Sequence, residues 1–255
     1  CAESVRARAA VFPDSGAQGI EVAGAYALFD GVDSPLTQTF ALGMFEPLTD
    51  ANLDRIEDFF RQRGSNVFHE VCPLSDSTTV QLLNERGYEP FEFSNVLYRS
   101  LENLAPPAAV DRETVSVRAI EPGEEDLWAR TAADGWRDAA PGLDDFFFEL
   151  AQLIRHRPNA PSFIAEKEGQ AIAAGAMGLF NGVALLAGAC TIPKWRQRGA
   201  QRALLAHRLR YGAERGCDLA MIVALPGSAS QRNAQREGFH IAYTRIKWRL
   251  RSGRA

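Results

Sequence analysis

The sequence lacks any window close to the roughly 18 uninterrupted apolar residues that a membrane-spanning helix requires, which predicts a soluble protein. Its four cysteines form no Cys-x-x-Cys pair, and its four histidines show no metal-ligand spacing. We therefore expect no metal site and no disulfide framework, and we expect the reducing cytoplasm as the compartment. A basic-then-apolar leader is also lacking, and the sequence begins at Cys1, so we expect the natural start to be processed or to lie outside this sequence.

What is present is enough apolar material for one large core or two ordinary ones: 46% of the 255 residues are hydrophobic and 24% are charged. This balance excludes a disordered or collagen-like chain. The net charge of −4 hides an uneven distribution, because residues 190–255 carry 14 Lys or Arg against 3 Asp or Glu. Such a basic stretch predicts a binding site for an anion.

An internal repeat organises the chain. Residues 24–32 and 175–183 share six of nine positions at an offset of 151, and the same offset carries Gly87-Tyr88 onto Gly238-Phe239. Two distant matches at one offset predict a duplicated domain. Asp30-Gly31 and Asn181-Gly182 fall at equivalent positions of the repeat, and each pair favours a two-residue hairpin turn because both residues tolerate positive φ.

The repeat predicts two domains, residues 1–104 and 114–255, joined by a linker at 105–113 that contains adjacent prolines. Mapped backwards, the offset places the first-half counterparts of nearly all of residues 115–155 before residue 1, so about 40 residues are expected to be missing from the first half. In the second domain the hydrophobic pattern predicts helices and strands in alternation. The expected strands are a short one near 115, then 162–167, 171–180, 183–192, 219–224 and 241–249, and the expected helices are 123–135, 144–155, 199–215 and 228–237.

Residues 193–205 join a predicted strand to the longest predicted helix and carry several arginines around Gly199. A helix start offers unpaired amides and the positive end of the dipole, and a glycine lets a ligand approach the backbone closely. The stretch therefore predicts a pyrophosphate site. A solvated basic helix start and a nucleic-acid surface are the alternatives, and the overall acidity argues against the second.

This stretch resembles the signature of the GNAT superfamily of acyl-CoA-dependent N-acetyltransferases. That signature is Arg or Gln, two residues, Gly, one residue, then Gly or Ala, and here Arg196 and Gly199 match while Gln201 departs. The order of elements agrees over the second half. The resemblance implies an α/β (α+β) fold of two tandem GNAT-like domains, each a mixed, mainly antiparallel twisted sheet flanked by helices. The corresponding first-half segment, residues 45–50, is acidic, so one cofactor site per chain is expected.

The resemblance also implies which residues bind the cofactor. The end of the strand before the loop would bind pantetheine through its main chain, the amides at the helix start would bind pyrophosphate, and Gln201 would turn its side chain outward, towards a phosphate oxygen. Polar residues of the last helix would bind the cofactor as well. The alternative is that they are an ordinary helix N-cap and solvent-exposed helix surface. The implied cofactor-binding set is Thr191, Ile192, Arg196, Gln197, Arg198, Gly199, Ala200, Gln201, Arg202, Ser230 and Asn233.

The usual catalytic pair of the family is missing. Ala234 stands where the family has its Tyr, and residues 183–192 contain no acid. Tyr243 is the candidate catalytic residue, with an interfacial aromatic as the alternative, and Cys190 is a weaker candidate because a thiol in so apolar a strand is usually inert. Acidic residues of the two early helices could wall an amine pocket or simply be solvated, and His207 is expected to face solvent.

The sequence thus predicts an N-acetyltransferase that moves an acetyl group from acetyl-CoA to a primary amine, with its active site in the second domain and no metal. Acetyl-CoA and the amine are the expected partners, nucleic acid and membrane are not, and the chain is expected to be a monomer or a homodimer. Two alternatives stay open: a non-catalytic acyl-CoA sensor or scaffold, and an assembly module whose acidic first half recruits a basic partner.

Overall fold

The computed structural model describes residues 1–102, 104, 115–138, 142 and 144–251. The predicted linker, 105–113, lies outside these residues. The chain forms two compact units: the first contains Cys1–Val96, Ala224–Gly227 and Ile241–Ala255, and the second contains Leu97–Val223 and Ser228–His240. The repeat predicted that all of 114–255 forms one domain, whereas the structure groups the last strand of the chain with the first unit.

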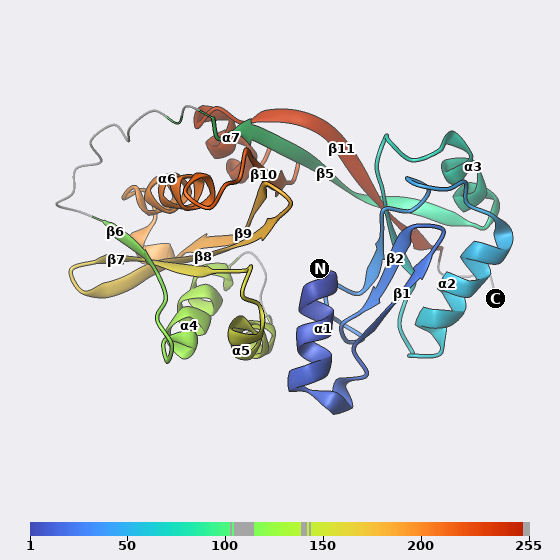
Figure 1. The fold of residues 1–255 in the computed structure, drawn as a ribbon, viewed down its shortest axis with the longest axis horizontal. Helices are drawn as coiled ribbons and strands as arrows, with labels where there is room; N and C mark the ends of the chain where they lie inside the picture. Colours follow the sequence, from blue (N-terminus) through green and yellow to red (C-terminus); the bar gives the residue numbers. More distant parts are fainter. Residues whose placement is uncertain (103, 105–114, 139–141, 143, 252–255) are drawn as a thin grey trace. The chain divides into compact units, whose positions relative to one another are not determined.

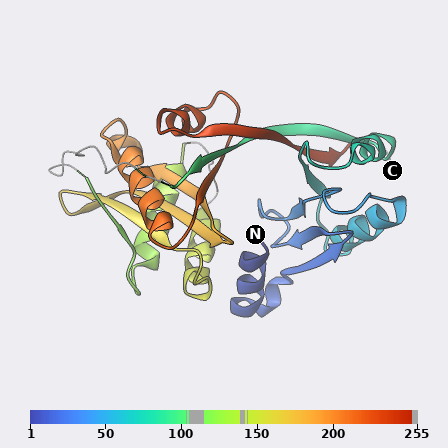
Figure 2. The same cartoon turned by 45° about the horizontal axis from the view of Figure 1, so that its top comes forward.

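The sheet of the first unit has the strand order β1-β2-β3-β4-β11-β5. All neighbours whose register is given pair antiparallel except β3 and β4, which are parallel. Strands β5 and β11 are long and run side by side (Figures 1 and 2). The elements are α1 (Ala2–Val11), a 3₁₀ turn (Pro13–Ser15), β1 (Gln18–Val22), β2 (Ala25–Phe29), β3 (Gln38–Phe40), α2 (Asp50–Arg61), β4 (Phe68–Val71), α3 (Ser77–Glu85), β5 (Tyr88–Ser100) and β11 (His240–Leu250).

Helix α2 shows why the first unit forms a core. Leu53, Ile56 and Phe60 recur at the spacing of one helix face, and all three are fully buried against the sheet. The last strand, β11, contributes Trp248 to the same core. A segment from the end of the sequence therefore completes the hydrophobic interior built by its beginning.

The second unit begins with residues Leu97–Ser100 of β5 and continues in the order β5-β10-β9-β8-β7-β6. Strands β6 to β9 pair antiparallel, and β9 pairs parallel with β10. Each predicted helix and strand of this half is found within a few residues of its predicted bounds. They are β6 (Ser116–Ala119), α4 (Glu125–Trp136), α5 (Asp144–Leu153), a 3₁₀ turn (Ile154–His156), β7 (Ser162–Lys167), β8 (Gln170–Phe180), β9 (Val183–Thr191), a second 3₁₀ turn (Pro193–Trp195), α6 (Ala200–Ala213), β10 (Leu219–Ala224) and α7 (Ala229–Arg236).

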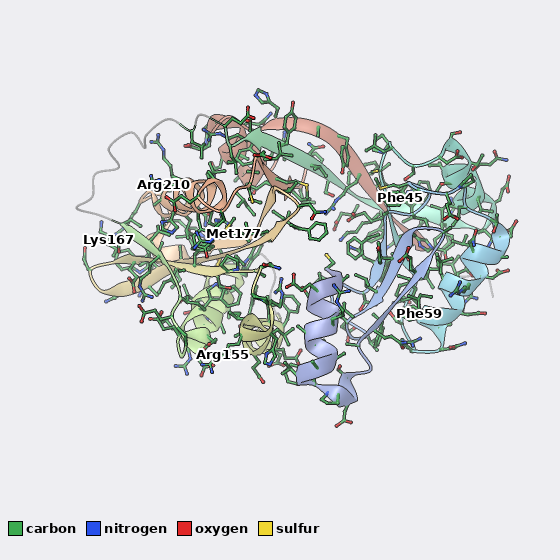
Figure 3. All side chains as sticks on the ribbon, in the orientation of Figure 1. Phe45, Phe59, Arg155, Lys167, Met177 and Arg210 are labelled. Carbon is green, nitrogen blue, oxygen red and sulfur yellow. The ribbon has the colours of Figure 1, made fainter. Side chains whose placement is uncertain are left out.

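Helices α4 and α5 cover one face of β7 to β9, and α6 covers the other (Figure 1). Gly212 allows α6 to lie close to the sheet, because a Cβ there would come within 2.9 Å of the Ala184 Cβ. Met177 lies between the strand and the helix, whereas Arg210 projects from the exposed side of α6 (Figure 3). His207, expected to face solvent, is half-buried and makes an edge contact with the Phe163 ring.

The two predicted hairpin turns differ. Asn181 and Gly182 both have positive φ, 46° and 77°, and join β8 to β9 as a two-residue turn. In the first half β2 and β3 are also antiparallel, but the connection runs from residue 30 to residue 37, and the prediction of a tight turn at Asp30-Gly31 is wrong there. The reason is local: the Asp30 N–H donates to the Thr37 hydroxyl at 2.9 Å and its carboxylate accepts from Ser34.

No helix among the described residues is long and apolar enough to cross a membrane.

Candidate functional site

Strands β9 and β10 diverge. They pair in parallel from Val183 and Leu219 as far as Leu186 and Ile222, and the ladder ends there. Just beyond, β9 is distorted by a bulge at Gly188, which has φ of 61°. From that point to its end, β9 pairs with β8 alone, so its other edge is open.

The loop after β9 turns sharply into α6. Gln197 and Gly199 both adopt left-handed backbone conformations, and Gly199 is the N-cap of the helix without any side-chain cap. A Cβ at Gly199 would meet nothing within 4 Å, so the corner is open rather than filled by side chains. Within the described part of the chain, the amides of residues 198–202 donate no hydrogen bond, whereas the next amide, of Ala203, bonds to the Gly199 carbonyl. Five consecutive amide donors at the positive end of a helix are therefore without an acceptor among the described residues.

A cavity of about 850 Å³ connects the open edge of β9 with this helix start. Its walls come from both faces of the sheet, with α4 on one side and α6 and α7 on the other. The lining residues are Gly135, Trp136, Ala189, Cys190, Thr191, Trp195, Arg196, Gln197, Gly199, Ala200, Gln201, Arg202, Leu205, Arg208, Ile222, Ala229, Ser230, Asn233, Ala234, Arg236 and Glu237. The cavity passes between the diverging strands, and we call it the cleft.

Arg196 fastens the loop to the neighbouring elements. Its guanidinium donates to the Asp138 carboxylate at 3.1 Å and to the carbonyls of Gly135 and Thr191 at 3.4 Å. The sequence assigned Arg196 to the cofactor. In the structure it lines the cleft, but its donors hold the end of α4 against the end of β9.

Gln201 occupies the position at which the signature has a small residue. Its side-chain amide donates to the Thr191 hydroxyl at 2.8 Å. The side chain therefore lies against the end of β9, which leaves the Gln201 main-chain amide exposed to the cleft. We expected this side chain to turn outward, towards a phosphate oxygen, but in the structure it contacts Thr191.

Helix α7 forms the far wall. Ser228 caps it by accepting from the Gln231 amide at 3.1 Å, and Ser230 and Asn233 lie further along on the cleft side. Across the cleft mouth, Arg202 of α6 forms an ion pair with Glu237 at 3.1 Å. Ser228 thus has the capping role, and Ser230 and Asn233 are left facing the cavity.

Nine of the twelve site residues named from the sequence line the cleft, and three do not. Ile192 donates its amide to the Ile172 carbonyl of β8, so it faces away from the open edge. Arg198 places its guanidinium over the Trp195 ring at 5.0 Å. Tyr243 lies on β11 in the first unit, whereas every residue lining the cleft belongs to the second. Burial raises the pKa of the Tyr243 hydroxyl, and the charge of the nearby Cys72 thiolate raises it further.

Cys190 lines the cleft, yet its environment suppresses reactivity. Burial raises the pKa of its thiol to about 11, so the thiolate is scarce at neutral pH. The thiol also packs tightly against α4, because a Cβ at Gly135 would come within 2.5 Å of its sulfur. Cys190 is therefore a packing residue that keeps α4 close to β9.

Two further residues line the cleft, and sequence reasoning assigned no role to the second of them, Arg208. Trp136 was predicted either to line the substrate pocket or to pack in the core; it borders the cleft, and its buried indole N–H has no hydrogen-bond partner among the described residues. Arg208 is 2% exposed and reaches the cleft from α6. It lies four residues from both Leu204 and Gly212 on the buried helix face, and an arginine on that face was the signal that could have found it.

Residues 125–239 match the family model described as Acetyltransferase (GNAT) family. This segment of the chain is similar to GNAT acetyltransferases. Among curated proteins, no sequence match was found.

Solved structures with the same fold cover nearly the whole chain. A GCN5-related N-acetyltransferase from Kribbella flavida is 19% identical and has a TM-score of 0.71, with 99% of this chain and 96% of that chain covered. Another from Sphaerobacter thermophilus is 19% identical and has a TM-score of 0.65, with 90% of this chain and 78% of that chain covered. A tandem GNAT protein from the clavulanic acid biosynthesis pathway is 14% identical and has a TM-score of 0.66, with 92% of this chain and 80% of that chain covered. These similarities confirm the predicted fold, a tandem GNAT arrangement with mainly antiparallel sheets flanked by helices.

The two GNAT-like units differ at the start of one helix, which follows β3 in the first unit and β9 in the second. In the first unit this helix is α2, and Thr49 and Asn52 form a reciprocal capping box: the Asn52 amide donates to the Thr49 hydroxyl at 3.2 Å and the Thr49 amide to the Asn52 side chain at 3.1 Å. In the second unit Gly199 supplies no cap. The first helix start is satisfied internally, whereas the second is available to a ligand.

Proposed function

We propose that this protein is an acyl-CoA-dependent N-acyltransferase whose active site is the cleft of the second unit, and that it transfers an acetyl or related acyl group to a primary amine. The observation that carries the proposal is the open row of five main-chain amides at the start of α6, placed where two parallel strands diverge. A phosphate group is the natural ligand of such a helix start. The match of residues 125–239 to the GNAT family model supports the same ligand.

In the proposed complex the pyrophosphate of CoA binds the amides of residues 198–202, and Arg202 and Arg236 at the cleft mouth favour its charge. The pantetheine arm lies along the open edge of β9. The Ile192 amide points towards β8, so alternation along the strand turns the Thr191 amide towards the arm. Ser230 and Asn233 contribute hydrogen bonds from α7.

The proposed reaction joins the amine nitrogen to the thioester carbonyl carbon and breaks the carbon–sulfur bond. The neutral amine attacks, the carbonyl oxygen becomes an oxyanion next to main-chain N–H groups of the open edge, and CoA leaves as a thiolate. The amine loses one proton and the thiolate gains one, so the products are an amide and free CoA. At the position where GNAT enzymes commonly have a tyrosine that donates this proton, the cleft has Ala234. Among the described residues, Glu237 is the sole carboxylate that lines the cleft.

Replacement of Gly199 by Glu tests the binding site. The substitution puts a negative side chain and a strained backbone at the proposed pyrophosphate site, so we expect CoA affinity measured by calorimetry to fall by at least about 100-fold.

Gly216→Glu is the matched control. Gly216 follows α6, has a similar φ of 76° against 83°, and is equally free of neighbours within 4 Å. The control variant should bind CoA like the wild type. The proposal fails if the intact protein does not bind CoA, or if both variants bind it equally well.

A second candidate function is a non-catalytic acyl-CoA sensor, and Ala234 at the usual position of the proton donor is the observation that favours it. Release of free thiol from acyl-CoA in the presence of a broad panel of amines separates the two. An enzyme is expected to release thiol in proportion to an added amine, with a matching acylated product by mass spectrometry. Tight binding of CoA without thiol release from any amine would identify the sensor.

The acceptor is proposed as a primary amine only. Two carboxylates of the early helices that the sequence offered for a cationic amine are paired, Asp134 with Arg137 and Asp138 with Arg196. They are less available for a positively charged acceptor than their number in the sequence indicates.

A further inference from the structure

Arg208 is a buried cation built into the inner part of the cleft. Its Nε donates to the Leu204 carbonyl at 3.3 Å, and its Nη1 donates to the carbonyls of Ala176 at 3.1 Å and Ala187 at 3.2 Å. Gly175 makes room for the guanidinium, since a Cβ there would lie 3.3 Å from Nη1. These contacts fix the planar group between α6 and the bulged part of β9.

The remaining nitrogen, Nη2, donates to no described atom. The side chain is 2% exposed, and Arg208 borders the cleft, so this nitrogen is left for whatever occupies the cleft. Burial lowers the pKa of Arg208 to about 10, and the group therefore stays protonated at neutral pH.

No carboxylate among the described residues neutralises this charge. The one carboxylate lining the cleft, that of Glu237, pairs with Arg202 at the mouth. A buried charge without a counter-ion is costly, and three carbonyl oxygens supply dipoles but no opposite charge. Such a site is complete only with an anionic ligand group.

The position of Arg208 indicates which part of the ligand this is. It lies eight residues after Ala200, so it is about 12 Å further along the helix axis than the proposed pyrophosphate site. At that depth the phosphates of a CoA molecule bound at the helix start are out of reach, so in the proposed complex the neighbour of Arg208 would be the pantetheine end with its acyl group. Leu205 and Ile222, which also line the cleft, are apolar.

We propose that the acyl group transferred by this protein carries a carboxylate, as in a dicarboxylic acid monothioester of CoA, and that Arg208 binds this carboxylate through Nη2. This inference rests on the proposed function, because it assumes that CoA occupies the cleft. A charge-assisted hydrogen bond in an apolar site discriminates strongly against a neutral acyl chain of the same length.

The reaction keeps the balance of the simpler transfer. The amine nitrogen bonds to the thioester carbonyl carbon, the carbon–sulfur bond breaks, and one proton passes from the amine to the thiolate. The distal carboxylate takes no part and remains on the product, which is an amide bearing a free carboxylate.

Binding of succinyl-CoA, butyryl-CoA and free CoA to the full-length protein tests the inference without knowledge of the acceptor amine. Succinyl and butyryl groups have four carbons each and differ in the terminal carboxylate. We expect calorimetry to give at least about ten-fold tighter binding of succinyl-CoA than of butyryl-CoA. Equal affinities, or a preference for butyryl-CoA, overturn the inference while leaving the proposed function intact if free CoA binds. Absence of binding by all three ligands overturns both.

Two variants locate the effect. Arg208→Met should remove the preference for succinyl-CoA and leave free CoA binding within about three-fold, whereas Arg208→Lys should retain part of the preference because it keeps the charge. If Arg208→Met weakens all three ligands equally, Arg208 binds the common arm and the inference is wrong. If the Met variant does not fold, the ratio of succinyl-CoA to butyryl-CoA affinity in the wild type and in Arg208→Lys still tests the inference.

Discussion

Fragments 1–104 and 114–255, when expressed separately, are expected not to fold, and when expressed together they should form a one-to-one complex. The cut removes the predicted linker, and each fragment then lacks a strand that its unit needs. Fragment 1–104 lacks β11, which pairs with β4 from Val71 to Phe68 and supplies Trp248 to the core. Fragment 114–255 lacks residues Leu97–Ser100, which belong to the second unit. Circular dichroism with thermal unfolding of each preparation measures the result.

Co-expression of 1–104 with 114–239 is the control. This pair has the same cut but no β11, so it should yield no stable complex on size-exclusion chromatography. Cooperative unfolding and CoA binding by 114–255 alone would show that the second unit needs no residue of β5, which would contradict the prediction.

Stability of the first unit is expected to fall steeply as the solution is made mildly acidic, because of His69. This side chain is fully buried, and neither ring nitrogen has a hydrogen-bond partner among the described residues. Burial lowers its pKa from 6.5 to about 3, so the folded state holds the ring neutral where the unfolded state binds a proton. Stability is therefore intact above pH 6.5 and is lost as the pH falls from 6.5 towards 3. The slope for one such group is about 1.4 kcal/mol per pH unit, or roughly 3 kcal/mol between pH 6.5 and 4.

Comparison of the wild type with His69→Leu isolates this effect from that of Glu70, because burial also raises the pKa of Glu70. Urea unfolding between pH 7 and 4 should give a shallower pH dependence for the variant by about one proton. The matched control, His156→Leu, replaces an exposed histidine and should leave the slope unchanged. An identical slope in wild type and His69→Leu would mean that His69 is protonated in the folded state.

The elements of the second unit follow from the sequence because their signals are local. The Asn181-Gly182 turn, the apolar run of β10 and the single buried face of α6 each depend on residues close together in the chain. Partnership between distant strands is not a local property. The apolar pattern of β11 predicts a strand equally well whichever sheet receives it, so its place in the first unit, and with it that of Tyr243, could not be read from periodicity.

The candidate site was predictable to the same degree. Gly199 and the open helix start follow from the loop's composition, and the structure brings these residues to a cleft. The roles of individual side chains depend on tertiary neighbours. Arg196 was expected to meet phosphate, but Asp138 and the end of α4 lie within its reach. Gln201 similarly meets Thr191, a contact that only the return of the chain from β9 to α6 creates.

The place of β11 in the first sheet affects how the protein folds while it is being translated. The ribosome completes β5 at Ser100, but the strand that covers the edge of β4 ends at Leu250. About 150 further residues must be translated before the first unit can close, which takes roughly 10–30 s at ordinary elongation rates. During that interval the nascent chain exposes the unpaired edge of β4, a surface to which chaperones or neighbouring nascent chains can bind.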